Sequence, residues 1–282
     1  MCTFADMTRT MLFLIALSLV LAACSSAASD PELVGIRAST DTAVGDERFL
    51  FAVAEIDGKR RGSPDERVTL IATSLDAPDV EISADAEFLW VIPNAIGLYR
   101  ADVPFDRPGL WEIEFDVSTG EETAPFLVDV LPAPTTVATG DVAPLIATPT
   151  SNDTPIADLT TDGNPMSSLY EMSLDEAFTN GQQSVVIFAT PAYCTSAACG
   201  PLLQQTKDAA AMFDDVNFIH VEVYSGFNEA GFQPDVDHLV PAVEAFKLPS
   251  EPWIFVIDEN GVVKARLEGV VGDGELEAAI NS

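Results

Sequence analysis

The chain has 282 residues, of which 45 are acidic and 13 are basic, so its formal net charge is −32. Such a surface repels phosphate groups, which excludes nucleic acid as a partner. It also repels anionic lipid headgroups, so any attachment to a membrane has to come from an apolar group.

The N-terminus has the pattern of a secretory signal. Residues 11–23 read MLFLIALSLVLAA without a charge, and Arg9 lies just before them. A basic start, a short apolar run and small residues before a cut site are typical of a signal peptide. The run is too short to span a bilayer comfortably. We therefore expect residues 1–23 to be a signal peptide.

The end of this run reads Leu21-Ala22-Ala23-Cys24, which resembles the lipobox of bacterial lipoproteins. That resemblance implies that Cys24 becomes acylated and is the first mature residue. Residues 24–32 would then be a lipidated tether on the extracytoplasmic side of the cell membrane. The alternative is an ordinary signal peptide with a chance cysteine at the cut site.

Residues 33–131 alternate strand-like runs with turns. Five runs are rich in β-branched and aromatic residues, with Gly, Pro and Asp between them, at residues 49–56, 67–73, 97–103, 110–117 and 124–130. This spacing predicts a β-sandwich. Residues 97–117 also resemble a hairpin of small immunoglobulin-like domains in bacterial exported proteins, including the YtkA-like group. Residues 30–132 contain no His or Met, so we expect a spacer or docking module without a metal site.

Residues 132–165 are rich in Pro, Thr, Ala, Asp and Asn, which is typical of a linker. From residue 166 the pattern changes to alternating helices and strands. Helices are predicted at residues 174–179, 201–213, 236–247 and 274–280, and strands at 184–189, 216–224, 253–257 and 262–267. The helical crossovers imply parallel strands. We therefore expect a second domain at residues 166–282.

Four cysteines occur in the chain, and two of them belong to the N-terminal signal and lipobox. The mature protein therefore keeps one pair, Cys194 and Cys199, which could be a disulfide, a redox couple or a metal site. Cys194 follows a buried strand and is expected near the start of a helix. Free N–H groups and the helix dipole at that position favour thiolate over thiol.

This placement resembles that of the redox cysteine in thioredoxin-like proteins. Tyr193 stands where thioredoxins usually carry Trp, and Pro252 before the strand at 253–257 resembles the cis-proline of that family. The resemblance covers residues 166–282 and implies an α/β thioredoxin-like fold. It makes Cys194 the attacking thiolate, Cys199 the resolving thiol and Pro252 part of the substrate surface. Protein thiols or disulfides would be the partners, with no cofactor and no metal.

The expected whole is a two-domain chain with an N-terminal immunoglobulin-like sandwich and a C-terminal thioredoxin-like domain. Its expected function is that of an extracytoplasmic, membrane-anchored thiol–disulfide oxidoreductase. The cysteine spacing departs from the family, because four residues separate the pair instead of two. In one regular helix such positions lie about 7.5 Å apart along the axis, and a disulfide needs Cα atoms within about 7 Å. A helix that begins at Gly200-Pro201 would remove the conflict.

Three other functions remain open. Some atypical peroxiredoxins resemble this chain in a Cys-x4-Cys helix preceded by Thr-Pro, as in Thr190-Pro191, but their activating residues are missing here. Sco-type copper proteins pair two cysteines with a distant His, for which His238 is available. The pair could also be an inert disulfide in a binding lipoprotein. His220 and His238 are otherwise expected to be structural or surface residues.

Overall fold

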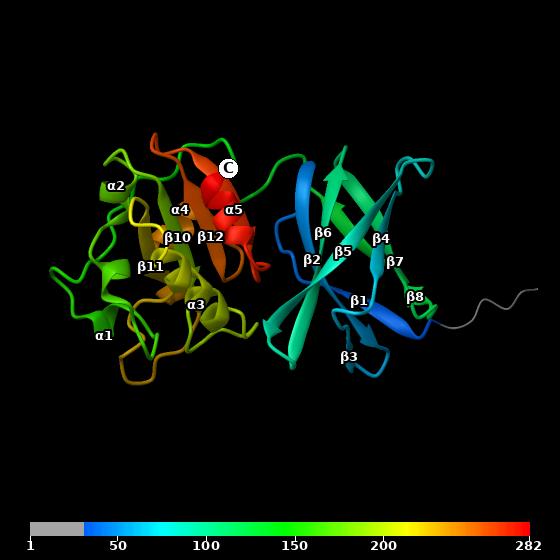
Figure 1. Cartoon of the computed structure of the whole chain (residues 1–282), viewed down its shortest axis with the longest axis horizontal. Coiled ribbons are helices and arrows are strands. Elements are labelled where there is room, and N and C mark those ends of the chain that lie inside the picture. Colours follow the sequence, from blue (N-terminus) through cyan, green and yellow to red (C-terminus); the bar gives the residue numbers. More distant parts are fainter. Residues whose placement is uncertain (1–30) are drawn as a thin grey trace, which may run out of the picture. The chain divides into compact units, whose positions relative to one another are not determined.

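The computed structural model describes residues 31–282 (Figure 1). The predicted signal peptide and Cys24 lie outside the described residues, so the signal and the lipid anchor stay predictions. Within the described residues, no helix is long and apolar enough to cross a membrane.

The N-terminal half forms one nine-stranded sheet. Its strands are β1 (Leu33–Arg37), β2 (Gly45–Glu55), β3 (Arg60–Arg61), β4 (Val68–Ser74), β5 (Glu81–Ile92), β6 (Ile96–Phe105), β7 (Gly109–Val117), β8 (Thr123–Ala124) and β9 (Phe126–Val130). They follow the order β8-β1-β2-β6-β5-β4-β7-β9, with β3 paired to β2. All pairs are antiparallel except β1 with β8.

This sheet curls until its two ends meet. The end strands β8 and β9 follow one another in the chain with only Pro125 between them. Leu131, just after β9, also bridges to Ala43, just before β2. The result is a nearly closed, barrel-like sheet with an aromatic core, in which the rings of Phe51 and Phe115 stack at 4.2 Å between centroids.

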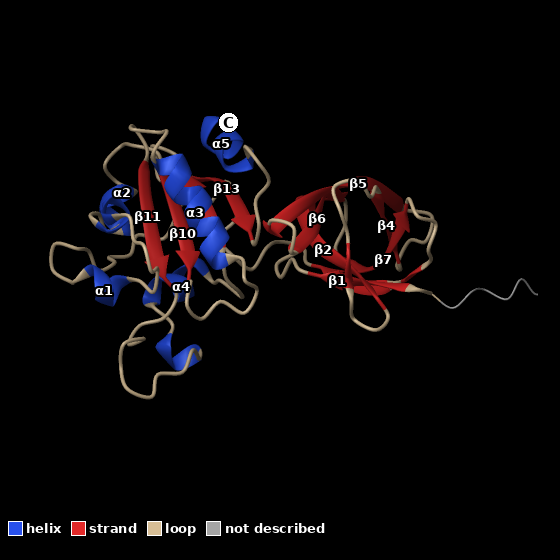
Figure 2. Cartoon of the chain, turned by 60° about the horizontal axis from the view of Figure 1, so that its bottom comes forward, coloured by secondary structure: helices blue, strands red, loops and turns tan. Residues whose placement is uncertain are grey.

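The C-terminal half contains a four-stranded sheet in the order β11-β10-β12-β13 (Figure 2). Its strands are β10 (Ser184–Ala189), β11 (Asn217–Glu222), β12 (Trp253–Ile257) and β13 (Val263–Glu268). Only β10 and β11 are parallel; β12 runs antiparallel to both of its neighbours. Its helices are α1 (Ile156–Leu159), the 3-10 turn η1 (Ser167–Tyr170), α2 (Leu174–Ala177), α3 (Cys199–Ala210), the 3-10 turn η2 (Val236–His238), α4 (Pro241–Phe246) and α5 (Glu275–Asn281).

Strand alternation sends β10 side chains to two cores. Val186 and Phe188 pack in the core that includes α4, whereas Val185 and Ile187 pack in the core that includes α3 and α5. All six residues of β10 are buried, which agrees with its apolar sequence. The helix α3 is therefore held against β10 by its apolar side, and its first residue lies at the carboxyl end of that strand.

The helix predicted at residues 236–247 is interrupted. A 3-10 turn covers Val236–His238, and α4 begins only at Pro241. Because the ring of a proline disfavours helical backbone in the residue before it, Val240 adopts an extended conformation with ψ of 149°.

The predicted fold class is therefore wrong. The described residues are mostly β, with a nearly closed barrel-like sheet instead of an immunoglobulin-like sandwich. The second sheet is mixed, with one parallel pair, and no clear α/β thioredoxin-like domain is present. Alternating apolar residues show that each strand has one buried face, but a sandwich and a curled sheet share that pattern. A sandwich and a curled sheet differ only in which strands pair with one another.

Residues 132–165 carry no strand and, within this range, only the short helix α1. They are nevertheless tied to both halves. The carboxylate of Asp41 accepts hydrogen bonds from the N–H and hydroxyl groups of Thr135 and Thr136, at 2.7 to 3.0 Å. Arg266 of β13 donates to the same carboxylate at 2.7 Å. The domain boundaries at residues 33, 132 and 166 stay predictions.

Candidate functional site

Cys194 and Cys199 form a disulfide, with their Cα atoms 6.0 Å apart. Cys199 is the first residue of α3, and Cys194 lies in the loop that follows β10. The helix thus begins at Cys199 and not at Pro201. Because Cys194 lies outside the helix, the pair can close within the Cα range of ordinary disulfides. Ala197 turns the loop with a left-handed φ of 61°.

The two sulfur atoms have different surroundings. Cys199 is fully buried, in the core that contains Leu202 and Leu203 of α3. Cys194 is only partly buried. A second sulfur atom approaching from solvent can therefore reach Cys194 far more easily than Cys199. The catalytic roles of the two residues stay predictions, but this difference matches the roles expected from the sequence.

Two polar groups lie next to the sulfur of Cys194. The backbone N–H of Cys199 donates to it at 3.3 Å, and the hydroxyl oxygen of Ser196 lies 3.3 Å away. The N–H belongs to the first turn of the 12-residue helix α3. Free N–H groups and the positive end of a helix dipole stabilise a thiolate. The start of α3 therefore places its positive end at the sulfur of Cys194.

Tyr193 and Pro252 flank this loop and the start of β12. The hydroxyl of Tyr193 donates to the carbonyl of Phe227 at 3.4 Å, and its ring lies 4.9 Å from that of Phe232. The Glu251–Pro252 peptide bond is cis, as expected. Pro252 is buried, and its carbonyl accepts the N–H of Gly269 at 2.9 Å. Its place on a substrate surface stays a prediction.

A cavity of about 450 Å³ lies beside the disulfide loop. Tyr193, Thr195 and Ser196 form one side, and Glu251 and Gly269 form another. The cavity thus joins the cysteine loop to the segment around the cis-proline. It is large enough for one or two side chains of a partner protein.

The N-terminal sheet supplies an apolar wall to this cavity. Leu50, Val91 and Leu98 line it from β2, β5 and β6. Gly269 allows this close approach, because a Cβ there would lie 2.9 Å from Leu50 and its φ of 71° suits glycine. Sequence reasoning missed these three residues. Leu50 lies just inside a predicted strand, Leu98 looks like an ordinary strand residue, and the strand of Val91 was not predicted.

The sequence matches no family model and no curated protein. The chemistry of the site is therefore inferred from its own residues.

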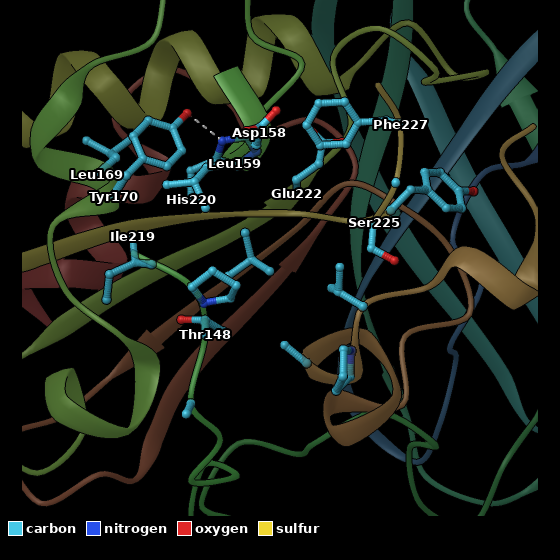
Figure 3. A pocket seen from close by; sticks show the side chains of 18 of the residues that line it. Thr148, Asp158, Leu159, Leu169, Tyr170, Ile219, His220, Glu222, Ser225 and Phe227 are labelled. Atoms are coloured by element: carbon cyan, nitrogen blue, oxygen red, sulfur yellow. Dashed lines mark hydrogen bonds between the residues drawn. The ribbon is translucent and has the colours of Figure 1, made fainter. Parts of the chain in front are cut away.

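A second group of polar residues lies along β11, one of the two edge strands of the four-stranded sheet (Figure 3). His220 is buried, and its Nδ1 lies 2.8 Å from the hydroxyl of Tyr170 while its Nε2 lies 3.1 Å from the carbonyl oxygen of Ala189. These contacts fit a neutral ring that donates from Nε2 and accepts at Nδ1. Burial lowers the pKa of His220 to about 4, so the ring is neutral at pH 7.

Glu222 ends the same strand and is also buried. Its Oε2 accepts from the N–H and hydroxyl of Thr161 at 2.7 and 2.9 Å. The hydroxyl oxygen of Thr161 in turn accepts the N–H of Ala192 in the cysteine loop at 3.1 Å. Sequence reasoning treated His220 as structural and missed Glu222. The signal was present, since residues 218, 220 and 222 share one face of a strand and two of them are polar.

His238, considered as a possible copper ligand, is half-buried, and its Nδ1 lies 2.7 Å from a carboxylate oxygen of Asp235. Across residues 31–282, no group of three or more His, Cys, Asp or Glu side chains is placed to hold a metal ion.

Proposed function

We propose that this protein is an extracytoplasmic, membrane-anchored thiol–disulfide oxidoreductase that acts on protein cysteines. The observation that carries the proposal is the asymmetry of the disulfide. Cys194 is partly exposed beside a cavity and next to the first N–H of a helix, while Cys199 is buried behind it. An inert structural disulfide does not need one reachable sulfur with thiolate-stabilising donors.

The reaction that fits this arrangement is stepwise exchange. In the reducing direction, the Cys194 thiolate attacks one sulfur of a partner disulfide and the other partner sulfur leaves as a thiolate, which takes up a proton. Cys199 then loses its proton and attacks the sulfur of Cys194, which releases the second partner thiol. Two electrons pass to the partner, and the pair ends as the observed disulfide. In the oxidising direction the same steps run backwards.

The burial of Cys199 suits the role of a resolving thiol. A partner sulfur that comes from solvent meets Cys194 and not the buried Cys199, so the mixed disulfide forms at Cys194. Cys199 lies five positions after Cys194, at the start of α3, so its attack is intramolecular and needs no second partner. The cavity beside Cys194 supplies room for the residues around a partner cysteine.

The membrane location rests on the sequence Leu21–Cys24. Acylation at Cys24 would hold the protein at the outer face of the cytoplasmic membrane or beyond it, where disulfides persist. Replacing Cys24 with Ser should leave an unprocessed or released chain in cell fractionation. Unchanged membrane association of that variant, without any other lipid attached, would exclude the anchor.

The enzymatic proposal is tested with two matched variants. Insulin reduction with glutathione as the electron source should be lost in Cys194→Ser. Cys199→Ser should lose turnover but accumulate a mixed disulfide with the substrate on a non-reducing gel, because the resolving thiol is gone. Wild-type activity in both variants, or a wild-type pair that never exchanges in glutathione buffers, would show that the disulfide is structural.

A further inference from the structure

The cavity beside the disulfide loop has charges of one sign only. Glu251 and Glu268 line it, and no Lys, Arg or His is among the described residues of its lining. Glu251 lies in the segment that leads into β12, and Glu268 ends β13. Arg48 donates to the backbone carbonyl of Glu268 at 2.9 Å, but its guanidinium pairs with the carboxylate of Glu275. The walls of the cavity therefore hold acidic groups without a cation.

The two acids differ in how far they already have partners. The carboxylate of Glu268 accepts from the N–H of Thr40 and from the hydroxyl of Ser250, both at 2.9 Å. Glu251 is half-buried, and burial raises its pKa without an offsetting hydrogen bond or cation from residues 31–282. A partly buried carboxylate without such a partner is costly, and a cation brought by another molecule would reduce that cost.

The charge of Glu251 acts on the aromatic side of the cavity. Burial raises the pKa of the Tyr224 hydroxyl, and the negative charge of Glu251 raises it further, while Tyr224 lines the same cavity. The ring of Phe232 joins Tyr224 to Tyr193, with centroid distances of 6.1 and 4.9 Å. Tyr193 directly precedes Cys194. Because a charge acts over about 8 Å at physiological ionic strength, a partner side chain in this cavity feels the charge of Glu251 without having to touch it.

We propose that Glu251 selects protein substrates in which a basic residue lies next to the reactive cysteine. This inference rests on the proposed oxidoreductase function and adds the class of substrate to it. The partner cysteine meets Cys194, apolar neighbours of that cysteine contact the wall formed by Leu50 and Leu98, and a basic side chain lies in the field of Glu251. The net charge of −32 acts in the same direction, since it attracts basic partners. An acidic neighbour would bring a second negative charge to a carboxylate that has no cation.

The test uses the purified full chain, reduced beforehand and freed of reductant, with disulfide-linked dimers of three short peptides. The peptides share an apolar residue before the cysteine and carry lysine, glutamine or glutamate after it. Cys194 attacks one peptide sulfur, and the other peptide leaves as a thiolate that takes up a proton. Cys199 then loses its proton and attacks Cys194, which releases the second peptide and forms the disulfide, so each chain reduces one dimer.

A neighbouring charge also alters the reactivity of a peptide disulfide by itself, so each rate is divided by the rate of the same dimer with dithiothreitol. At pH 8 and low salt, the normalised rate with the lysine peptide should exceed that with the glutamate peptide by about tenfold or more, with glutamine between them. This preference should shrink in about 0.5 M NaCl.

Three variants locate the preference. Glu251→Gln should reduce it to about threefold or less, whereas Glu251→Asp keeps the charge and should keep most of it. Glu259→Gln is the matched control, because Glu259 is exposed in the turn after β12, lies outside the cavity lining and loses the same charge. It should keep the wild-type preference. All three variants should melt near the wild-type temperature.

The outcomes separate this inference from the function on which it rests. Equal normalised rates of the wild type with the lysine and glutamate peptides would overturn the selection and leave the oxidoreductase function standing. A preference that Glu251→Gln and Glu259→Gln reduce equally would assign it to the overall charge and overturn the role of Glu251. A wild type that reduces no dimer faster than Cys194→Ser does would contradict the proposed function and this inference together.

Discussion

Reduction of the Cys194–Cys199 disulfide should leave the protein folded and only modestly less stable. The two cysteines are five positions apart, so the disulfide closes a loop of six residues. For a loop of that length, the restriction of the unfolded chain contributes about 2 kcal/mol to the free energy of unfolding. Folded domains have about 5 to 15 kcal/mol available. Both redox states should therefore be folded, as an exchanging pair requires.

The assay is urea unfolding at pH 7 of the oxidised protein and of the protein reduced with a phosphine. The midpoint should fall by an amount equal to about 2 kcal/mol, with an unchanged slope. Folding and disulfide formation are linked in one thermodynamic cycle. The equilibrium constant for forming the disulfide is therefore about 30-fold larger in the folded chain than in the unfolded chain. Cys194→Ala/Cys199→Ala is the matched control and should unfold like the reduced protein. A reduced protein that is unfolded without urea would refute the reasoning and make the disulfide a structural element.

Three further predictions concern Asp41, the cysteine loop and the wall of the cavity beside it. Asp41 is buried, which raises its pKa, but its hydrogen bonds from Thr135 and Thr136 outweigh burial and lower the pKa to about 2. Because its folded pKa lies below the ordinary value, its stabilisation of about 2 kcal/mol is present above about pH 4 and is lost as pH falls toward 2. The loss of unfolding free energy between pH 7 and pH 3, measured by urea unfolding, should therefore be smaller in Asp41→Asn than in the wild type. The exposed Asp46→Asn is the control and should behave as wild type. Ala197→Gly should raise the melting temperature, by relieving about 1 kcal/mol of left-handed strain; a lower melting temperature would contradict this account. Leu98→Ser should raise the KM for insulin about tenfold, since it removes apolar wall area from the cavity. The rate with a small aromatic disulfide should be unchanged. Equal effects on both substrates would show that this wall does not contact the protein substrate.

The strands and the cysteine site of the C-terminal half could be predicted from local sequence. Residues 184–189 and 253–257 are short apolar runs bounded by polar residues, and both form strands over those residues. The position of Cys194 after the first of these runs, and the proline before the second, are features of adjacent residues in the chain. Their signals therefore needed no knowledge of long-range pairing.

The rest depended on contacts between distant residues. Five of the nine N-terminal strands could be recognised by their alternation, whereas β1, β3, β5 and β8 were not predicted. The pairing of β2 with β6, rather than with a strand of a second sheet, joins residues 48 to 60 positions apart in sequence. Leu98 looks like any other half-buried strand residue, and only the approach of Gly269 and the cysteine loop makes it a cavity wall. The polar face of β11 was visible in the sequence, but the contact of Glu222 with Thr161 joins residues 61 positions apart.

The near closure of the N-terminal sheet also bears on how copies of this protein can associate. One end of the sheet is the two-residue strand β8, and the adjoining residue, Pro125, has no N–H to offer. Long, open edges are the usual template on which another chain adds a strand and starts an aggregate. At this end of the sheet the template is only two residues long. Together with the net charge of −32, so short an edge disfavours self-association by strand addition at β8.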